Sequence, residues 1–159
     1  MTGHIQHMTD MDLSGILALN NAHQKETSFL EMADLNWLVT NAYYARGVAP
    51  ANAFLIGFDQ DGDYKSPNFL WFRERYKRFA YIDRVITANE ARGQGLARAL
   101  YENLFTTAKA DGYSIVGCEV NQDPPNPGSD AFHAKLGFEH VGTATLANGK
   151  TVRYLTKLL

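Results

Sequence analysis

Hydrophobic and polar residues follow two periods along this chain, and the two periods predict where strands and helices lie. Apolar residues that alternate or form short runs predict strands at residues 5–8, 53–58, 78–87 and 114–120. Apolar residues that recur at intervals of three and four predict helices at residues 13–20, 32–43 and 96–110. Thr9 and Asp10 are the candidate N-caps of the first helix. The helix at 96–110 has the strongest pattern of the three.

Turn-forming residues complete this outline. Ser66-Pro67 predicts the start of a helix whose continuation, residues 68–76, is rich in aromatic side chains. Three prolines within residues 122–128 predict an irregular segment, and residues 129–136 then predict a short helix. Asn148-Gly149 predicts a hairpin turn between strands at residues 138–146 and 151–158.

The most informative stretch of the sequence is Arg92-Gly93-Gln94-Gly95-Leu96-Ala97, which lies between a predicted strand and the strongest predicted helix. Glycines let the backbone approach a ligand closely, and the N-terminus of a helix attracts negative charge. Arg92 adds donors that suit phosphate oxygens. The pattern therefore predicts a site for a phosphate-bearing ligand.

Other ligand loops fit this stretch poorly. A nucleoside triphosphatase loop needs Lys-Ser or Lys-Thr after its last glycine, and here Leu96-Ala97 follow. A dinucleotide loop needs three glycines early in a βαβ unit, and this loop has two glycines past the middle of the chain. The acidic residues at 59–63 lack the spacing of a calcium loop and indicate a solvated turn. We therefore expect no metal site.

Length and composition indicate a single domain spanning residues 1–159. A net charge of −2 disfavours nucleic acid as the main partner. No apolar stretch is long enough for a membrane span, and residues 1–4 do not resemble the start of a signal peptide. The single cysteine, Cys118, suits a reducing compartment, so we expect a cytoplasmic protein. Cys118 falls within a strand pattern and is expected to pack in the core.

Two motifs together resemble the GNAT superfamily of N-acetyltransferases. The first, written Gln/Arg-x-x-Gly-x-Gly/Ala in that family, is matched by Arg92, Gly95 and Ala97. The second is matched, at the expected distance downstream, by Asn126, Ser129, Phe132, Gly137 and Phe138. The resemblance covers residue 53 to the C-terminus well, and the first fifty residues match only in the order of elements.

The resemblance implies an α/β (α+β) fold with a mixed, mostly antiparallel central sheet of six to seven strands flanked by about four helices. The sheet is expected to splay between the strands before and after the long helix. The resemblance also implies acetyl-CoA as co-substrate, with its pyrophosphate on the glycine loop and its pantetheine arm along the preceding strand. The implied cofactor residues are Val85, Ile86, Thr87, Arg92, Gly93, Gln94, Gly95, Leu96, Ala97, Arg98 and Asn126.

Two residues are candidates for proton transfer. An amine must lose a proton to attack a thioester, and the leaving thiolate benefits from an acid. Glu119 lies where some family members place a base, although its position is also consistent with a partly exposed carboxylate at the end of a strand. His133 stands where many members carry tyrosine, and it also reads as a structural histidine on a short helix. Tyr101 and Tyr113 are poorer candidates because they lie on or beside the long helix.

The resemblance implies an acyltransferase that moves an acetyl group to a primary amine of a small molecule by direct attack in a ternary complex. A non-catalytic acyl-CoA sensor and a protein or peptide N-acetyltransferase are the alternatives. The aromatic residues Trp37, Phe69, Trp71 and Phe72 suggest an apolar acceptor, whereas the acidic residues Glu26, Glu31 and Asp34 suggest a site for its ammonium group. Homodimers are common in the family, and the sequence names no interface.

Overall fold

The structure of the protein is a computed structural model that describes residues 4–159. Met1–Gly3, which belong to the segment examined for a signal peptide, lie outside the described residues. The strands are β1 (Ile5–His7), β2 (Tyr44–Val48), β3 (Ala53–Asp59), β4 (Ala80–Thr87), β5 (Ile115–Asp123), β6 (Glu139–Thr145) and β7 (Thr151–Leu158). The α-helices are α1 (Leu13–Ala22), α2 (Met32–Asn41), α3 (Pro67–Arg73), α4 (Leu96–Ala110) and α5 (Pro127–Lys135). Two short 3-10 helices, η1 (Met8–Asp10) and η2 (Asn89–Ala91), complete the list.

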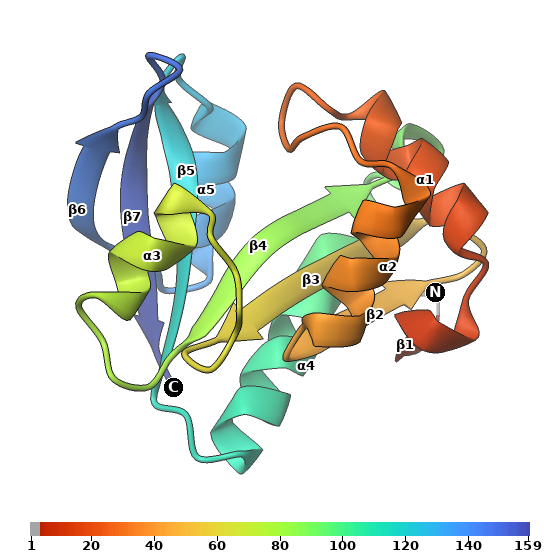
Figure 1. The fold of residues 1–159 in the computed structure, drawn as a ribbon, viewed down its shortest axis with the longest axis horizontal. Coiled ribbons are helices and arrows are strands. Elements are labelled where there is room, and N and C mark those ends of the chain that lie inside the picture. Colours follow the sequence, from red (N-terminus) through yellow and green to blue (C-terminus); the bar gives the residue numbers. More distant parts are fainter. Residues whose placement is uncertain (1–3) are drawn as a thin grey trace.

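The seven strands form one sheet in the order β1-β2-β3-β4-β5-β7-β6. Every neighbouring pair is antiparallel except β4 and β5, which are parallel. In Figure 1, α1, α2 and α3 lie on one face of the sheet, and α4 and α5 lie on the other. These features confirm the predicted fold class. The sheet has seven strands, and α3 lies in the segment that connects β3 to β4.

Aromatic side chains fill the space between α3 and the strands that it covers, and they form part of the hydrophobic core. Phe69, Phe72, Phe79 and Tyr81 are almost completely buried there. Gly117 of β5 lies directly under Phe72, and a Cβ at this glycine would come within 2.5 Å of the ring. The absence of a side chain at Gly117 therefore sets how closely α3 approaches the sheet.

Two predicted details of the first two helices were wrong for identifiable reasons. The first helix begins at Leu13 as predicted, but its N-cap is Asp12 rather than Thr9 or Asp10, because Asp12 accepts a hydrogen bond from the Ser14 N–H at 3.0 Å. The second helix ends at Asn41, and β2, which the helical pattern concealed, follows after two residues. These two corrections leave the order of the helices unchanged.

The proline-rich segment is shorter than predicted. β5 continues to Asp123, which pairs with Thr151 of β7 after a register shift. Pro127 occupies the first turn of α5, where a missing N–H costs nothing because that group has no partner within the helix.

In the part of the chain that the structure describes, every helix falls short of the length and apolarity that a bilayer span demands.

Candidate functional site

The glycine loop joins β4 to α4 as predicted, with η2 interposed. Gly93 has φ +81° and Gly95 has φ +74°, a left-handed backbone that glycine adopts without strain. Gly95 is the N-cap of α4 and offers no side chain to the free N–H groups of the first turn. Those N–H groups and the positive end of the helix dipole therefore remain available to an anion.

A cavity of about 380 Å³ lies in front of this loop. Every predicted cofactor residue except Gln94 and Asn126 lines this cavity, together with residues from the α1–α2 loop, η2 and α5. Its lining is His23, Glu26, Val85, Ile86, Thr87, Ala91, Arg92, Gly93, Gly95, Leu96, Ala97, Arg98 and Phe132. Gln94 lies exposed in the loop. The last three residues of β4 and the N-terminus of α4 thus face one ligand-sized space.

β4 and β5 separate immediately beyond a short region of contact. They pair only at Ala80–Val116 and Tyr81–Gly117, so the remainder of β4 has β3 on one side and no β5 partner on the other. This confirms the predicted splay. The backbone of Val85–Thr87 is consequently free to hydrogen-bond an extended ligand along its open edge.

A second cavity, of about 470 Å³, occupies the splay and meets the first at Glu26 and Val85. Glu119 and His133, the two candidates for proton transfer, both line it, as does Asn126. Asn126 is also the N-cap of α5, where its Oδ1 accepts the Ser129 N–H at 3.2 Å. The structure therefore brings the predicted catalytic pair into one space beside the predicted cofactor loop.

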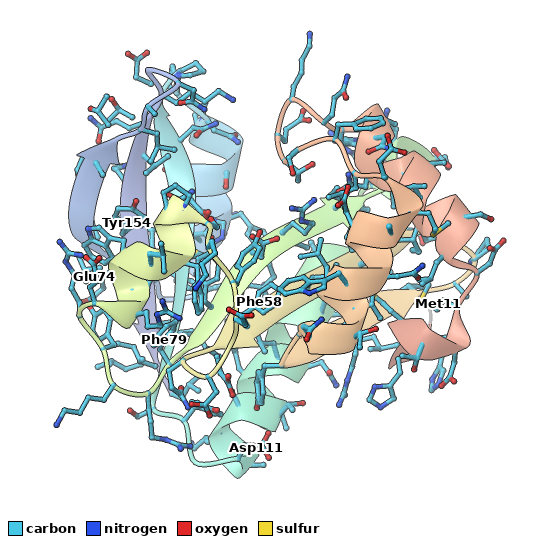
Figure 2. The ribbon with its side chains drawn as sticks, viewed as in Figure 1. Met11, Phe58, Glu74, Phe79, Asp111 and Tyr154 are labelled. Carbon is cyan, nitrogen blue, oxygen red and sulfur yellow. The ribbon has the colours of Figure 1, made fainter. Side chains whose placement is uncertain are left out.

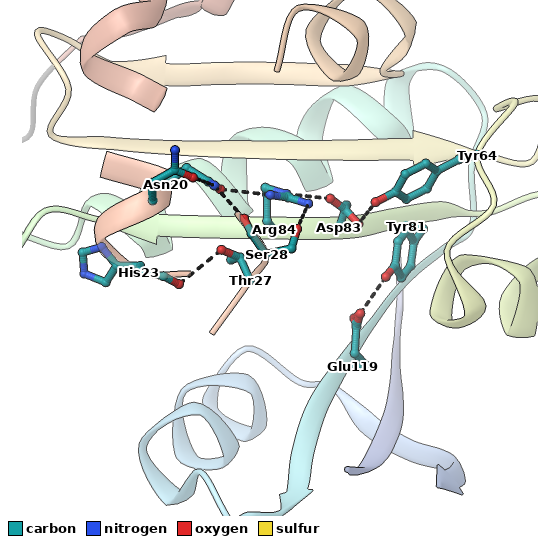
Figure 3. A network of polar contacts seen from close by, with 10 residues as sticks. Asn20, His23, Thr27, Ser28, Tyr64, Tyr81, Asp83, Arg84 and Glu119 are labelled. Atoms are coloured by element: carbon teal, nitrogen blue, oxygen red, sulfur yellow. Dashed lines mark hydrogen bonds and ion pairs between the residues drawn. The ribbon is translucent and has the colours of Figure 1, made fainter. Parts of the chain in front are cut away.

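Glu119 lies in the middle of β5 rather than at its end. Its Oε1 accepts a hydrogen bond of 2.6 Å from the hydroxyl of Tyr81, which is fully buried on β4 (Figure 3). Burial raises the pKa of Glu119 to about 7, against the opposing effect of the Tyr81 hydrogen bond. A carboxyl group with this pKa can accept a proton near neutral pH and release it again.

His133 is buried on α5, and both its ring nitrogens have partners. Nδ1 lies 2.8 Å from the carbonyl oxygen of Ser129, and Nε2 lies 2.9 Å from the hydroxyl of Tyr101 on α4. Since a carbonyl can only accept, Nδ1 carries the proton and Nε2 accepts from Tyr101. Burial lowers the pKa of His133, which favours this neutral form. Tyr101 lines the second cavity, a role that its position on the long helix did not suggest.

A buried ion pair forms part of the wall of the second cavity and was not predicted. Arg84 Nε donates to Asp83 Oδ2 at 2.8 Å, and each side chain is only 6% exposed. Arg84 also donates to Asn20 Oδ1 at 2.9 Å and to Ser28 Oγ at 3.3 Å, while the Tyr64 hydroxyl donates to Asp83 Oδ1 at 2.8 Å (Figure 3). The network fastens the loop between α1 and α2 to β4.

The aromatic residues that suggested an apolar acceptor line neither cavity. Phe69 and Phe72 are core residues, Trp71 stacks on Tyr154, and Trp37 is 39% exposed on α2. Polar and charged groups line most of the second cavity instead, among them Ser28, Ser66, Asn68, Asn121, Asn148 and Lys150. Of the suggested acids, Glu26 lines both cavities, whereas Glu31 and Asp34 form the capping box of α2.

Known proteins resemble this chain in sequence and in fold. Phosphinothricin N-acetyltransferase of Streptomyces coelicolor is 36% identical over 70 residues, which are 44% of this chain and 40% of that protein. The match therefore spans less than half of the curated relative. Among solved structures, Ard1 from Thermoplasma volcanium has a TM-score of 0.73 at 16% identity, covering 100% of this chain and 99% of that one.

The NatC complex bound to Gag peptide and CoA contains a chain with a TM-score of 0.72 at 12% identity, covering 100% of this chain and 99% of its own. At these identities the solved structures establish the fold. The profile of the acetyltransferase (GNAT) family matches residues 54–138, just over half of the sequence, and this stretch contains the glycine loop, α4 and the whole of α5. The chain belongs to the acetyltransferase (GNAT) family.

Proposed function

We propose that this protein transfers the acetyl group of acetyl-CoA to a primary amine of a small molecule, by direct attack in a ternary complex. The observation that carries the proposal is the meeting of two cavities at Glu26 and Val85, one before the glycine loop and one containing Glu119. A donor in the first cavity and an acceptor in the second would meet where β4 and β5 part.

The first cavity suits the phosphate and pantetheine parts of acetyl-CoA. The N–H groups of the loop and of the first turn of α4 would hold the pyrophosphate, with Arg92 and Arg98 supplying positive charge. The open edge of Val85–Thr87 would pair with the amide groups of the pantetheine arm. Asn126, at the N-terminus of α5, would then contact the arm from the opposite wall.

Glu119 is the proposed base. The ammonium group of the acceptor loses a proton to the Glu119 carboxylate, and the freed nitrogen attacks the thioester carbon. As the new C–N bond replaces the C–S bond, the nitrogen gives up its second proton to water and becomes the amide nitrogen. Coenzyme A departs as a thiolate that acquires its proton on release to water. Near pH 7 the carboxylate is available in a substantial fraction of molecules, because its pKa is about 7.

His133 is proposed to act on the leaving thiolate through Tyr101. Its one N–H, on Nδ1, is held by the Ser129 carbonyl, so the ring itself has no proton to present to sulfur. Nε2 instead fixes the Tyr101 hydroxyl at the cavity wall. As negative charge develops, the hydroxyl hydrogen turns from Nε2 to the sulfur and stabilises the thiolate.

A contact across the second cavity, between the β6–β7 hairpin and the α1–α2 loop, favours a small acceptor. Lys150, from the β6–β7 hairpin, donates to the backbone carbonyl of Lys25 in the α1–α2 loop at 3.5 Å. This contact joins the two walls of the cavity and narrows the path that an extended peptide would need. A peptide N-terminus is the rival acceptor, and the NatC structure bound to a peptide is one reason to test it.

The second candidate function is an acyl-CoA sensor without turnover, which the neutral, fully hydrogen-bonded His133 favours. Release of free thiol in the presence of an amine separates the two functions. The main proposal also places the protein in the cytoplasm, because its single cysteine is buried and forms no disulfide.

It further includes a homodimer, which analytical ultracentrifugation tests by measuring the mass in solution.

Replacing Gly95 with alanine is expected to weaken acetyl-CoA binding at least about tenfold, a loss of about 1.4 kcal/mol. A Cβ at Gly95 meets no protein atom within 4 Å, so it would stand in the open space from which the pyrophosphate approaches. Isothermal titration of acetyl-CoA measures the effect. Absence of binding by the unmodified protein at about 1 mM ligand would contradict the proposed donor.

Gly112→Ala is the matched control. Gly112 lies beyond the other end of α4 with φ +89°, so alanine there meets the same backbone strain without facing the cavity. We expect the control to lose stability and to keep its affinity for acetyl-CoA. Equal losses of affinity in the two variants would show that strain, rather than the phosphate site, explains the Gly95 result.

A further inference from the structure

α3 and its aromatic residues have no part in the chemistry described above, although the helix is built firmly onto the sheet. Trp71 stacks on Tyr154 of β7, with ring centroids 4.1 Å apart, and the Arg75 guanidinium lies 4.1 Å from the Trp71 ring. Gly142 of β6 makes room for Trp71, since a Cβ there would lie 2.3 Å from the indole. Figure 2 shows Tyr154 where α3 overlies β7. The first turn of α3 is thereby fixed at the wall of the second cavity.

That first turn carries Asn68, which lines the same cavity as Glu119. The hydroxyl of Tyr154 donates to Asn68 Oδ1 at 2.8 Å. Burial raises the pKa of Tyr154 to about 12, so the hydroxyl keeps the proton that it donates. Tyr154 and Glu119 are directly opposite each other on β7 and β5, which places the Asn68 amide beside the carboxylate. With Oδ1 occupied, the amide nitrogen is the group of Asn68 left to face Glu119, and Asn68 lowers the pKa of that carboxyl.

We propose that Asn68 is a positioning residue for Glu119: its amide, oriented by Tyr154 and carried by α3, holds the carboxylate from one side while the Tyr81 hydroxyl holds it from the other. This inference rests on the proposed role of Glu119 as the base. Two fixed donors set the plane of the carboxylate and leave its remaining lone pairs toward the cavity. α3 is therefore part of the active site, although its aromatic residues line neither cavity.

The electrostatic surroundings of Glu119 oppose its ionisation. Asp83 on β4 adds negative charge near Glu119, and burial disfavours the ionised carboxylate further. The tyrosines that surround it stay neutral, because burial raises their pKa values, and the Cys118 thiol stays neutral for the same reason. These groups are Tyr81 from β4, Tyr101 from α4, Tyr154 from β7 and the adjacent Cys118. Asn68 and Tyr81 thus oppose the groups that would keep Glu119 protonated.

The test compares Asn68→Ala with the unmodified protein by following the Glu119 carboxyl carbon in an NMR pH titration. Loss of the amide is expected to raise the Glu119 pKa by about one unit. The ratio of variant to unmodified kcat/KM should then fall about fivefold at pH 7 and return toward one by pH 9, with acetyl-CoA affinity unchanged. An unchanged pKa together with an unchanged pH profile would overturn the proposal.

Two tyrosine variants extend the test in case Asn68→Ala folds poorly. Tyr154→Phe keeps the stack on Trp71 and removes only the donor that orients Asn68, so it should shift the Glu119 pKa upward by a smaller amount. Tyr113→Phe removes a hydroxyl that donates to Asp59 at 2.6 Å outside both cavities and should shift nothing. Equal titrations in the two variants would contradict the role of Tyr154. The NMR titration needs no turnover, so a failure of acetyl transfer itself would be seen separately.

Discussion

Replacing Glu119 with glutamine is expected to lower kcat/KM by about 100-fold to 10,000-fold at pH 7 to 8, the range typical of a lost general base. Glutamine keeps an oxygen for the Tyr81 hydroxyl and fits the same space, so the loss reports the proton acceptor rather than the shape of the cavity. Steady-state kinetics with the best amine acceptor measure it. A variant that keeps more than one tenth of the activity would exclude Glu119 as the base.

The same substitution is expected to stabilise the fold at alkaline pH. The pKa of Glu119 is raised from 4.5 to about 7 in the folded protein, so its ionisation there costs stability progressively as the pH rises from 4.5 to 7. At pH 8 the cost is up to about 3 kcal/mol, and glutamine avoids it. Urea unfolding should show a much larger gain for the variant at pH 8 than at pH 5, where only a small part of the cost is present. Glu139→Gln, an exposed change on β6, is the control and should alter neither activity nor stability.

Replacing Arg84 with methionine is expected to destabilise the protein by about 3–5 kcal/mol, because it leaves the buried Asp83 without its cation. Asn20 and Ser28 also lose their guanidinium partner, so the α1–α2 loop is released from β4. Urea unfolding at pH 7 measures the loss. The double variant Asp83→Asn, Arg84→Met removes both charges and should recover a large part of it.

The control for this prediction is Arg98→Met, which breaks an ion pair with Glu102 on the exposed face of α4. Both partners of that pair are more than half exposed, so little change in stability is expected. Equal destabilisation by the two methionine variants would mean that burial does not strengthen the Asp83–Arg84 pair. A double variant no more stable than Arg84→Met would lead to the same conclusion.

The parts of the site that could be predicted are those that consecutive residues determine. The glycine loop, the bounds of α4 and the hairpin at Gly149 each depend on residues close in sequence, and all three are present as expected. The splay between β4 and β5 followed from the family resemblance that the two motifs established. A motif fixes where a backbone site lies because its geometry is local.

Contacts between distant residues could not be predicted in this way. Arg84 meets Asn20 across 64 positions of sequence, and His133 meets Tyr101 across 32. The motif placed His133 near the thioester, yet only the fold reveals that Ser129 and Tyr101 occupy both its nitrogens. Aromatic content likewise could not distinguish core from cavity: Phe69 and Phe72 suggested an acceptor site, but both are completely buried side chains of α3 that belong to the core.

The measurement that tests the central claim most directly is release of free CoA thiol from acetyl-CoA, followed across amino acids, polyamines, aminoglycosides and short peptides. The protein is expected to release thiol with at least one small primary amine and to form the N-acetylated product in equal amount, with peptides giving no release above background. Binding of acetyl-CoA without thiol release for any acceptor would contradict the account and favour a sensor, and release with peptides alone would contradict the proposed small-molecule acceptor.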